Sequence, residues 1–113
     1  VVIVDVLGNS NPVLNNFLQT IETIRDPSHV RDYNLAEWTT MAEMAGFRIQ
    51  TIEKGTLTLD FASWVKRMNT PTDAVATIRQ LQQTASEMVK RYFAIQADGS
   101  FTTETLYLVL TKT

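Results

Sequence analysis

The sequence predicts an α/β fold built on an open sheet of three strands. Two apolar runs, VVIVDV at residues 1–6 and LYLVL at residues 106–110, are typical of strands buried on both faces. Helical periodicity fills most of the chain between them, around a more polar strand that suits the edge of a sheet. A doubly buried strand needs more neighbours than this chain supplies, so we expect the chain to be the second half of a larger α/β domain.

The first helix is expected over residues 12–25. A turn at residues 7–11 (LGNSN) precedes it, because glycine and asparagine tolerate left-handed backbone. Asn11 followed by Pro12 is typical of a helix cap and a first helical residue. Apolar residues then recur at helical spacing: Leu14, Phe17, Leu18, Ile21 and Ile24. Pro27 disfavours helical geometry in the residue before it, so residues 25–33 should turn sharply.

The second helix and the polar strand follow. Asn34 and Glu37 have the spacing of a reciprocal capping pair, and Gly46 is placed to end the helix in left-handed geometry. Residues 47–53 are expected to form a strand. The alternation shifts at Ile52, which predicts a bulge or turn at Lys54–Gly55 before the strand resumes over residues 56–59.

The remaining elements are two helices and a closing strand. Asp60 is expected to cap a short helix with Phe61, Trp64, Val65 and Met68 on one side. The run TPTD at residues 70–73 predicts the start of a long helix that extends to about residue 93. A turn at residues 97–100 (ADGS) then leads into a strand over residues 101–110.

Composition excludes several classes of function. Ten basic and twelve acidic residues give a formal net charge of -2, and the basic residues are scattered, which argues against nucleic acid or anionic membrane as partner. The absence of cysteine removes disulfides, thiolate nucleophiles and Cys-ligated zinc, and it fits a cytoplasmic protein. No run approaches the roughly 20 apolar residues of a membrane span.

His29 is the only histidine and hence the candidate catalytic residue. An imidazole beside a carboxylate such as Asp26 suits a general base near neutral pH. The competing interpretation is a surface histidine in a turn capped by Asp26 and Ser28. A Ser-His-Asp triad of adjacent residues has poor geometry, and one histidine without cysteine argues against a metal site.

Four other residues are candidates for a substrate pocket: Asp5, Phe17, Arg25 and Tyr33. Ligands of open α/β sheets bind beyond the carboxyl ends of the strands, and these residues follow or flank the end of the first strand. Asp5 has the competing role of a turn residue, which we favour. The competing role of Arg25 is to pair with Asp26 or Glu22 on the surface. Phe17 and Tyr33 could instead belong to the core.

The order of elements and several segments resemble one family. The opening VVIVDV, the run RDPSHVRDYNLAEWTTMAEMAGF, the segment FASWVKRMNTP and the closing ETLYLVLTKT are similar to the C-terminal half of class I S-adenosylmethionine-dependent methyltransferases of the small-molecule type, related to ubiquinone and menaquinone biosynthesis. The resemblance implies that the last strand is antiparallel and inserts between the other two in a Rossmann-like sheet. It also implies a methyl donor, S-adenosylmethionine, and a small organic acceptor.

One part of the family pattern is missing. The donor of these enzymes binds at a glycine-rich loop, whereas the four glycines here stand alone. The resemblance therefore implies the substrate side of the enzyme, with the cofactor half absent from residues 1–113 and the chain inactive alone. A non-catalytic α+β binding or dimerisation module is the alternative, and a His29-dependent hydrolase or isomerase is a weaker one. An apolar first strand with a free edge further predicts a homodimer.

Overall fold

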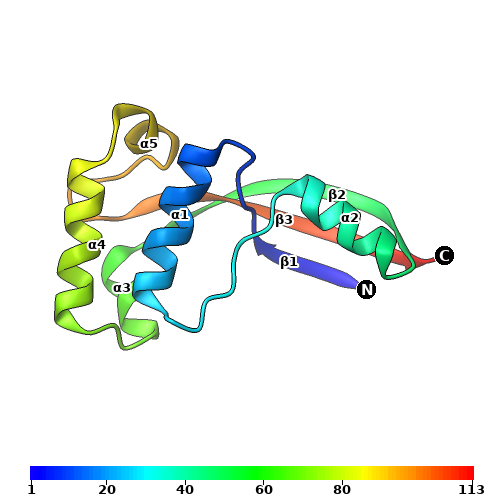
Figure 1. The fold of residues 1–113 in the computed structure, drawn as a ribbon, viewed down its shortest axis with the longest axis horizontal. Helices are drawn as coiled ribbons and strands as arrows, with labels where there is room; N and C mark the ends of the chain where they lie inside the picture. The colour runs from blue at the N-terminus through cyan, green and yellow to red at the C-terminus, as the bar shows by residue number, and fades with distance from the viewer.

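The computed structural model describes residues 1–113 and contains one sheet of three strands. The strands are β1 (Val2–Val6), β2 (Phe47–Leu59) and β3 (Phe101–Lys112), in the order β1-β3-β2 (Figure 1). β3 is antiparallel to both neighbours, so β1 and β2 run parallel to each other. The predicted α/β class, its three strands and its antiparallel last strand are confirmed.

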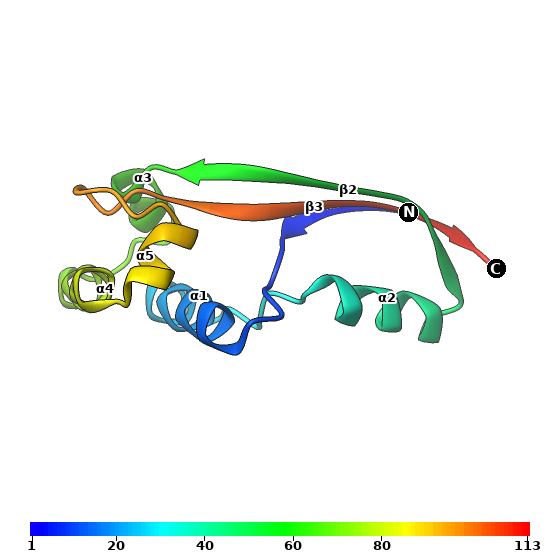
Figure 2. The same cartoon turned by 90° about the horizontal axis from the view of Figure 1, so that it is seen from above.

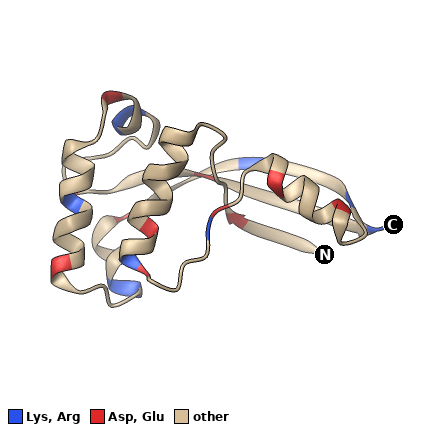
Figure 3. Ribbon diagram, in the orientation of Figure 1, with Lys and Arg blue, Asp and Glu red and all other residues tan.

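Five helices connect the strands: α1 (Pro12–Arg25), α2 (Leu35–Met44), α3 (Phe61–Arg67), α4 (Thr72–Thr84) and α5 (Glu87–Tyr92). Seen from above, α1, α2, α4 and α5 lie on the same side of the sheet (Figure 2). The opposite face of β1 and of the adjoining part of β3 carries no helix. None of the helices is long and apolar enough to cross a membrane. Lys and Arg are spread over several helices and strands and are interspersed with Asp and Glu (Figure 3).

This one-sided arrangement corrects the prediction that the terminal strands are buried on both faces. Val2 and Val4 are 56% and 70% exposed, and Tyr107, which pairs with Val4, is 38% exposed. The residues of β3 that alternate with Tyr107 point to the other face and are buried beneath the helices: Leu106, Leu108 and Leu110. A continuous run of apolar residues therefore does not mean that both faces of the strand are buried: in this chain no helix covers the second face. The outer edge of β1 is unpaired as well, and the homodimer stays a prediction.

Two cores lie beneath the helices. The larger one joins α1, α3, α4 and α5 to the start of β3, through residues that include Leu18, Trp64, Ile78 and Phe101. The smaller one packs α2 against the far half of β3. Leu7 belongs to the smaller core, and so the turn between β1 and α1 is anchored where the two cores meet.

The predicted helix ends are confirmed. The Asn11 side chain accepts a hydrogen bond from the Val13 amide, and that of Asp60 accepts one from Ser63. Asn34 and Glu37 form both bonds of the reciprocal capping pair. Gly46 follows α2 with a φ of 84°, in the region that favours glycine.

Two local predictions are wrong. The single helix expected to reach about residue 93 is broken at Ala85 and Ser86, which have extended backbone with ψ near 155° and 159°. The Ser86 side chain caps α5, because serine competes for backbone donors and favours helix starts. The bulge of β2 lies between Ile49 and Thr51, whereas Gly55 pairs regularly with Thr105. β2 is consequently one continuous strand.

Candidate functional site

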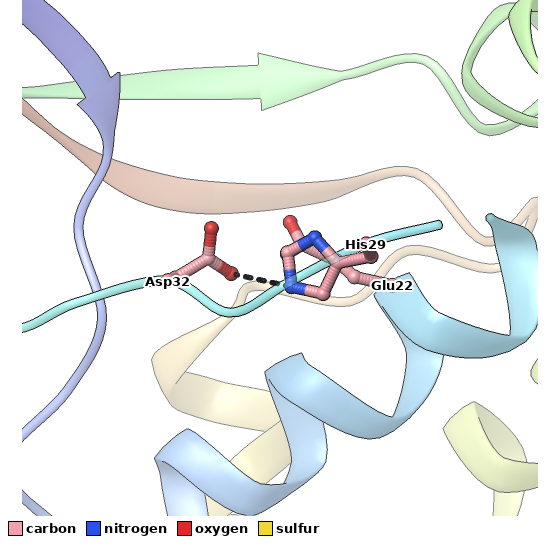
Figure 4. Close-up of side chains that lie close together, drawn as sticks. All are labelled: Glu22, His29 and Asp32. Carbon is pink, nitrogen blue, oxygen red and sulfur yellow. Dashed lines mark ion pairs between the residues drawn. The ribbon is translucent and has the colours of Figure 1, made fainter. Parts of the chain in front are cut away.

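The segment after α1 brings His29 against two buried carboxyl groups, Glu22 and Asp32. His29 Nε2 lies 3.1 Å from Glu22 Oε2 and 3.8 Å from Asp32 Oδ2. Figure 4 shows the three side chains converging between α1 and the sheet, next to the end of β1. We call these residues the Glu22–His29–Asp32 cluster.

Gln19 and Gly8 hold this segment in place. The Gln19 Nε2 donates to the Asp32 carbonyl at 3.0 Å, and Gln19 Oε1 accepts from the Asp32 amide at 3.0 Å. The Gly8 amide donates to the Tyr33 carbonyl at 2.8 Å. A Cβ atom on Gly8 would lie only 2.4 Å from the Asp32 carbonyl oxygen, so the close approach requires glycine.

The cluster is short of positive charge. Glu22 and Asp32 are each 6% exposed, and neither Glu22 Oε2 nor Asp32 Oδ2 forms a hydrogen bond. Burial, followed by the neighbouring Asp32 carboxyl, raises the pKa of Glu22 to about 10. At neutral pH the buried pair of Glu22 and Asp32 therefore keeps one proton.

Asp26, the carboxylate expected to orient the imidazole, has other partners. Its Oδ1 accepts from the Ser28 amide at 3.0 Å and from the Ser28 hydroxyl at 2.6 Å. These bonds hold the pKa of Asp26 below its usual range. Sequence reasoning missed Glu22 and Asp32, although Glu22 stands four residues after Leu18 on the apolar stripe of α1. A carboxyl group on a buried helix face is a signal that could have found it.

The predicted pocket residues lie in different surroundings. Arg25 faces α3: its Nε donates to the Trp64 carbonyl at 2.8 Å, and its guanidinium lies 4.7 Å from the Trp64 ring centroid. Phe17 packs on the Phe93 ring, 5.5 Å between centroids. Asp5 is exposed at the end of β1, and its carboxylate accepts from the Val6 amide. The structure does not gather these residues into one pocket, and their roles there stay predictions.

Tyr33 is the predicted pocket residue that lines a hollow. It packs edge-on against Trp38, 5.6 Å between ring centroids, and borders a depression of about 390 Å³ along α2. The neighbouring residues Asn34 and Glu37 supply polar groups to the same wall.

Two further hollows lie at the carboxyl end of β1, where ligands of open α/β sheets bind. One, of about 280 Å³, is lined by residues 7–10 and 34–36 together with Lys54 and Glu104. The other, of about 380 Å³, shares Lys54 and Glu104 and adds Tyr92, whose hydroxyl donates to the Glu104 carboxylate. Burial and this carboxylate raise the pKa of Tyr92 to about 12. Sequence reasoning did not identify Tyr92 and Glu104 as site residues. A glutamate inside the closing strand is a signal that could have indicated Glu104.

The glycines do not offer a cradle for a nucleotide-like cofactor. Gly8 is packed against the Asp32 backbone, and Gly55 is paired in the sheet. Gly46 and Gly99 supply the positive φ values of turns, 84° and 93°. The residues of this chain therefore do not fit the methyl donor that the resemblance implies.

The comparisons with known proteins agree with the geometry. The chain is 44% identical over 103 residues to the uncharacterised protein YafE of Escherichia coli (strain K12), covering 91% of this chain and 50% of that protein. It is 36% identical over 93 residues to the uncharacterised methyltransferase YcgJ of Bacillus subtilis (strain 168), covering 82% of this chain and 37% of the relative. No protein-family model matches the chain.

Solved structures give the same result. The candidate methyltransferase BH2331 of Bacillus halodurans C-125 superposes with a TM-score of 0.91 and 26% identity, over 96% of this chain and 53% of that structure. The YcgJ structure superposes with a TM-score of 0.81 and 30% identity, over 95% and 49%. The chain thus spans about half the length of the proteins it matches. It is homologous to that portion of them, a region of the class I S-adenosylmethionine-dependent methyltransferase fold.

Proposed function

We propose that this chain forms the substrate side of an S-adenosylmethionine-dependent methyltransferase that acts on a small organic molecule. The observation that carries the proposal is the match, along nearly the whole chain, to YcgJ and BH2331, both described as methyltransferases. The polar hollows at the carboxyl end of β1 support it, because they lie where an open α/β sheet binds its ligands.

In this proposal the chain's own residues position the acceptor. Lys54, Glu104 and the hydroxyl of Tyr92 offer hydrogen bonds to a polar acceptor from two adjoining hollows. Fixing the acceptor in a water-poor site supplies most of the rate enhancement when the reaction is a direct group transfer. S-adenosylmethionine supplies the methyl group when bound, and we place its binding in the half of the relatives that this chain does not match.

Donor binding tests the division into two halves. The 113-residue chain should show no measurable S-adenosylmethionine binding by calorimetry, because its four glycines stand apart and form no glycine-rich loop that could cradle the donor. A longer protein that contains the chain should bind the donor. Low-micromolar binding to the 113 residues alone would sink the proposed division, and a longer protein that fails to bind would sink the enzyme.

His29 is the residue of this chain for which we expect a kinetic effect. Gly8 lines the hollow at the end of β1 and also touches Asp32, so the cluster and the hollow share a wall. In the longer protein, His29→Ala should lower turnover or acceptor affinity at least about tenfold, less than the roughly 10²–10⁴-fold contribution typical of a general acid or base. Donor affinity should stay nearly unchanged.

The measurement is transfer of a labelled methyl group to the native acceptor, with donor binding measured in parallel. Asp26→Asn is the matched control, since asparagine keeps an oxygen for the Ser28 bonds and Asp26 does not touch the imidazole. Equal kinetics for wild type and His29→Ala would return His29 to the role of a surface residue.

A non-catalytic binding or dimerisation module is the second candidate function. The observation that favours it is the exposed apolar face of β1, with Val2 and Val4. The donor-binding measurement on the longer protein separates the candidates, because a module of this kind has no use for a methyl donor.

A further inference from the structure

We propose that Glu22, His29 and Asp32 bind one first-row divalent cation, with Zn²⁺ the ion favoured, and that this site clamps residues 26–34 onto α1. The inference goes beyond the methyltransferase proposal, because a binding measurement tests it without any activity. The sequence itself argues against a metal site, since the chain has one histidine and no cysteine.

The geometry suits a metal ion. One nitrogen and two carboxylate oxygens, one atom from each residue, lie within 4.8 Å of one another. Ligands about 2.0–2.2 Å from a zinc ion are about 3–3.5 Å apart in a tetrahedral site. The distances of 3.1 Å from His29 Nε2 to Glu22 Oε2 and 3.8 Å to Asp32 Oδ2 need only a small closure to reach that spacing.

The electrostatics calls for a cation. Glu22 Oε2 and Asp32 Oδ2 are both buried and form no hydrogen bond, and His29 Nε2 is the polar atom that approaches both of them. The arginines closest in sequence are occupied elsewhere: Arg25 bonds the Trp64 carbonyl, and Arg31 pairs with Glu37 at 2.7 Å. One proton can bridge only two atoms, whereas one divalent ion can bind both oxygens and the imidazole nitrogen together. Burying two ionised carboxylates without such compensation is costly, so in the absence of an ion one of them holds a proton.

The surroundings resemble the supporting shell of a metal site. Gln19 holds the Asp32 backbone by two hydrogen bonds and thereby fixes the position of one ligand. Its Oε1 also lies 3.1 Å from His29 Nε2 and offers a fourth ligand atom, the third oxygen of the set. Residues that orient ligands in this way raise metal affinity. The imidazole nitrogen favours Zn²⁺ over Mg²⁺ and Mn²⁺, which prefer oxygen ligands, and the affinity order of divalent ions also places Zn²⁺ above Mn²⁺.

The site is enclosed, and this determines its role. His29 is a partly buried side chain between buried carboxyl groups, and none of the described hollows opens onto it. With the ion bound, His29 is a ligand and a positioning residue. Its influence on acceptor turnover then passes through residues 26–34, which border the hollow at Asn34.

Zinc titration tests the site. The full protein, freed of metal with a chelator, should bind one equivalent of zinc chloride by calorimetry, and its thermal midpoint should rise with zinc and fall again with chelator. His29→Ala, Glu22→Gln and Asp32→Asn should each weaken zinc binding at least about tenfold. Glu43→Gln, a substitution of an exposed carboxylate on α2, is the control and should bind zinc like wild type.

Two results would overturn the site. One is a wild-type protein with no saturable zinc binding. The other is zinc affinity unchanged in both His29→Ala and Asp32→Asn. Circular dichroism verifies the fold of each variant. If His29→Ala fails to fold, the near-isosteric Glu22→Gln and Asp32→Asn variants decide, because they keep the side-chain volumes and replace a carboxyl group with a neutral amide.

Discussion

Replacing Trp64 with alanine should lower the free energy of unfolding by about 3–5 kcal/mol, the range for large aromatic residues removed from a core. Trp64 is 2% exposed and belongs to the larger core. Its ring meets Phe101 edge-on at 5.0 Å and Phe61 at 6.2 Å between centroids. It also carries the Arg25 guanidinium on its face. The substitution would leave a cavity where α1, α3 and β3 meet.

Urea denaturation followed by circular dichroism measures this loss. Trp38→Ala is the matched control, because Trp38 is only half-buried, on α2. It should cost clearly less. Equal losses for the two variants, or a loss below about 1 kcal/mol for Trp64→Ala, would contradict the assignment of Trp64 to the core centre.

The elements that depend on local chemistry could be predicted from the sequence. The caps at Asn11, Asn34 and Asp60 follow from short-range hydrogen bonds, and each was predictable from its neighbours. The break at Ser86 was equally local, but the apolar stripe continues through it and concealed the cap. The exposed face of β1 was not predictable, since a strand's sequence does not say whether a second layer is present to cover it.

The candidate site depends on how the chain folds back after α1, which the sequence does not specify. His29 stood out as the single histidine, but the carboxyl groups beside it come from seven residues before and three residues after it, at 22 and 32. They meet because the chain reverses after α1 and then docks on Gly8. The Tyr92–Glu104 pair likewise joins α5 to β3 across a turn. Spacing in sequence does not specify such contacts.

Gly8→Ala should therefore be the substitution that most directly damages the site. The added Cβ would lie 2.4 Å from the Asp32 carbonyl oxygen and 2.9 Å from the carbonyl carbons of Asp32 and Tyr33. All three are backbone atoms, so no side-chain rotation can relieve the contact. The segment must move away, and the Gly8–Tyr33 hydrogen bond of 2.8 Å is strained or lost. We expect a loss of about 1–3 kcal/mol in stability, the usual cost of overpacking.

The decisive observation is which part of the chain loses stability in Gly8→Ala. Amide hydrogen exchange should rise in residues 26–34 of Gly8→Ala, and acceptor turnover should fall with it, while α4 stays protected. Gly55→Ala is the control, because its Cβ would meet only the Thr105 hydroxyl at 3.1 Å, a side-chain atom that can rotate away. If Gly8→Ala leaves exchange in residues 26–34 at the level of Gly55→Ala, the turn after β1 does not hold that segment. Gln19 on α1 would then be the residue that positions the cluster, through its two hydrogen bonds to the Asp32 backbone.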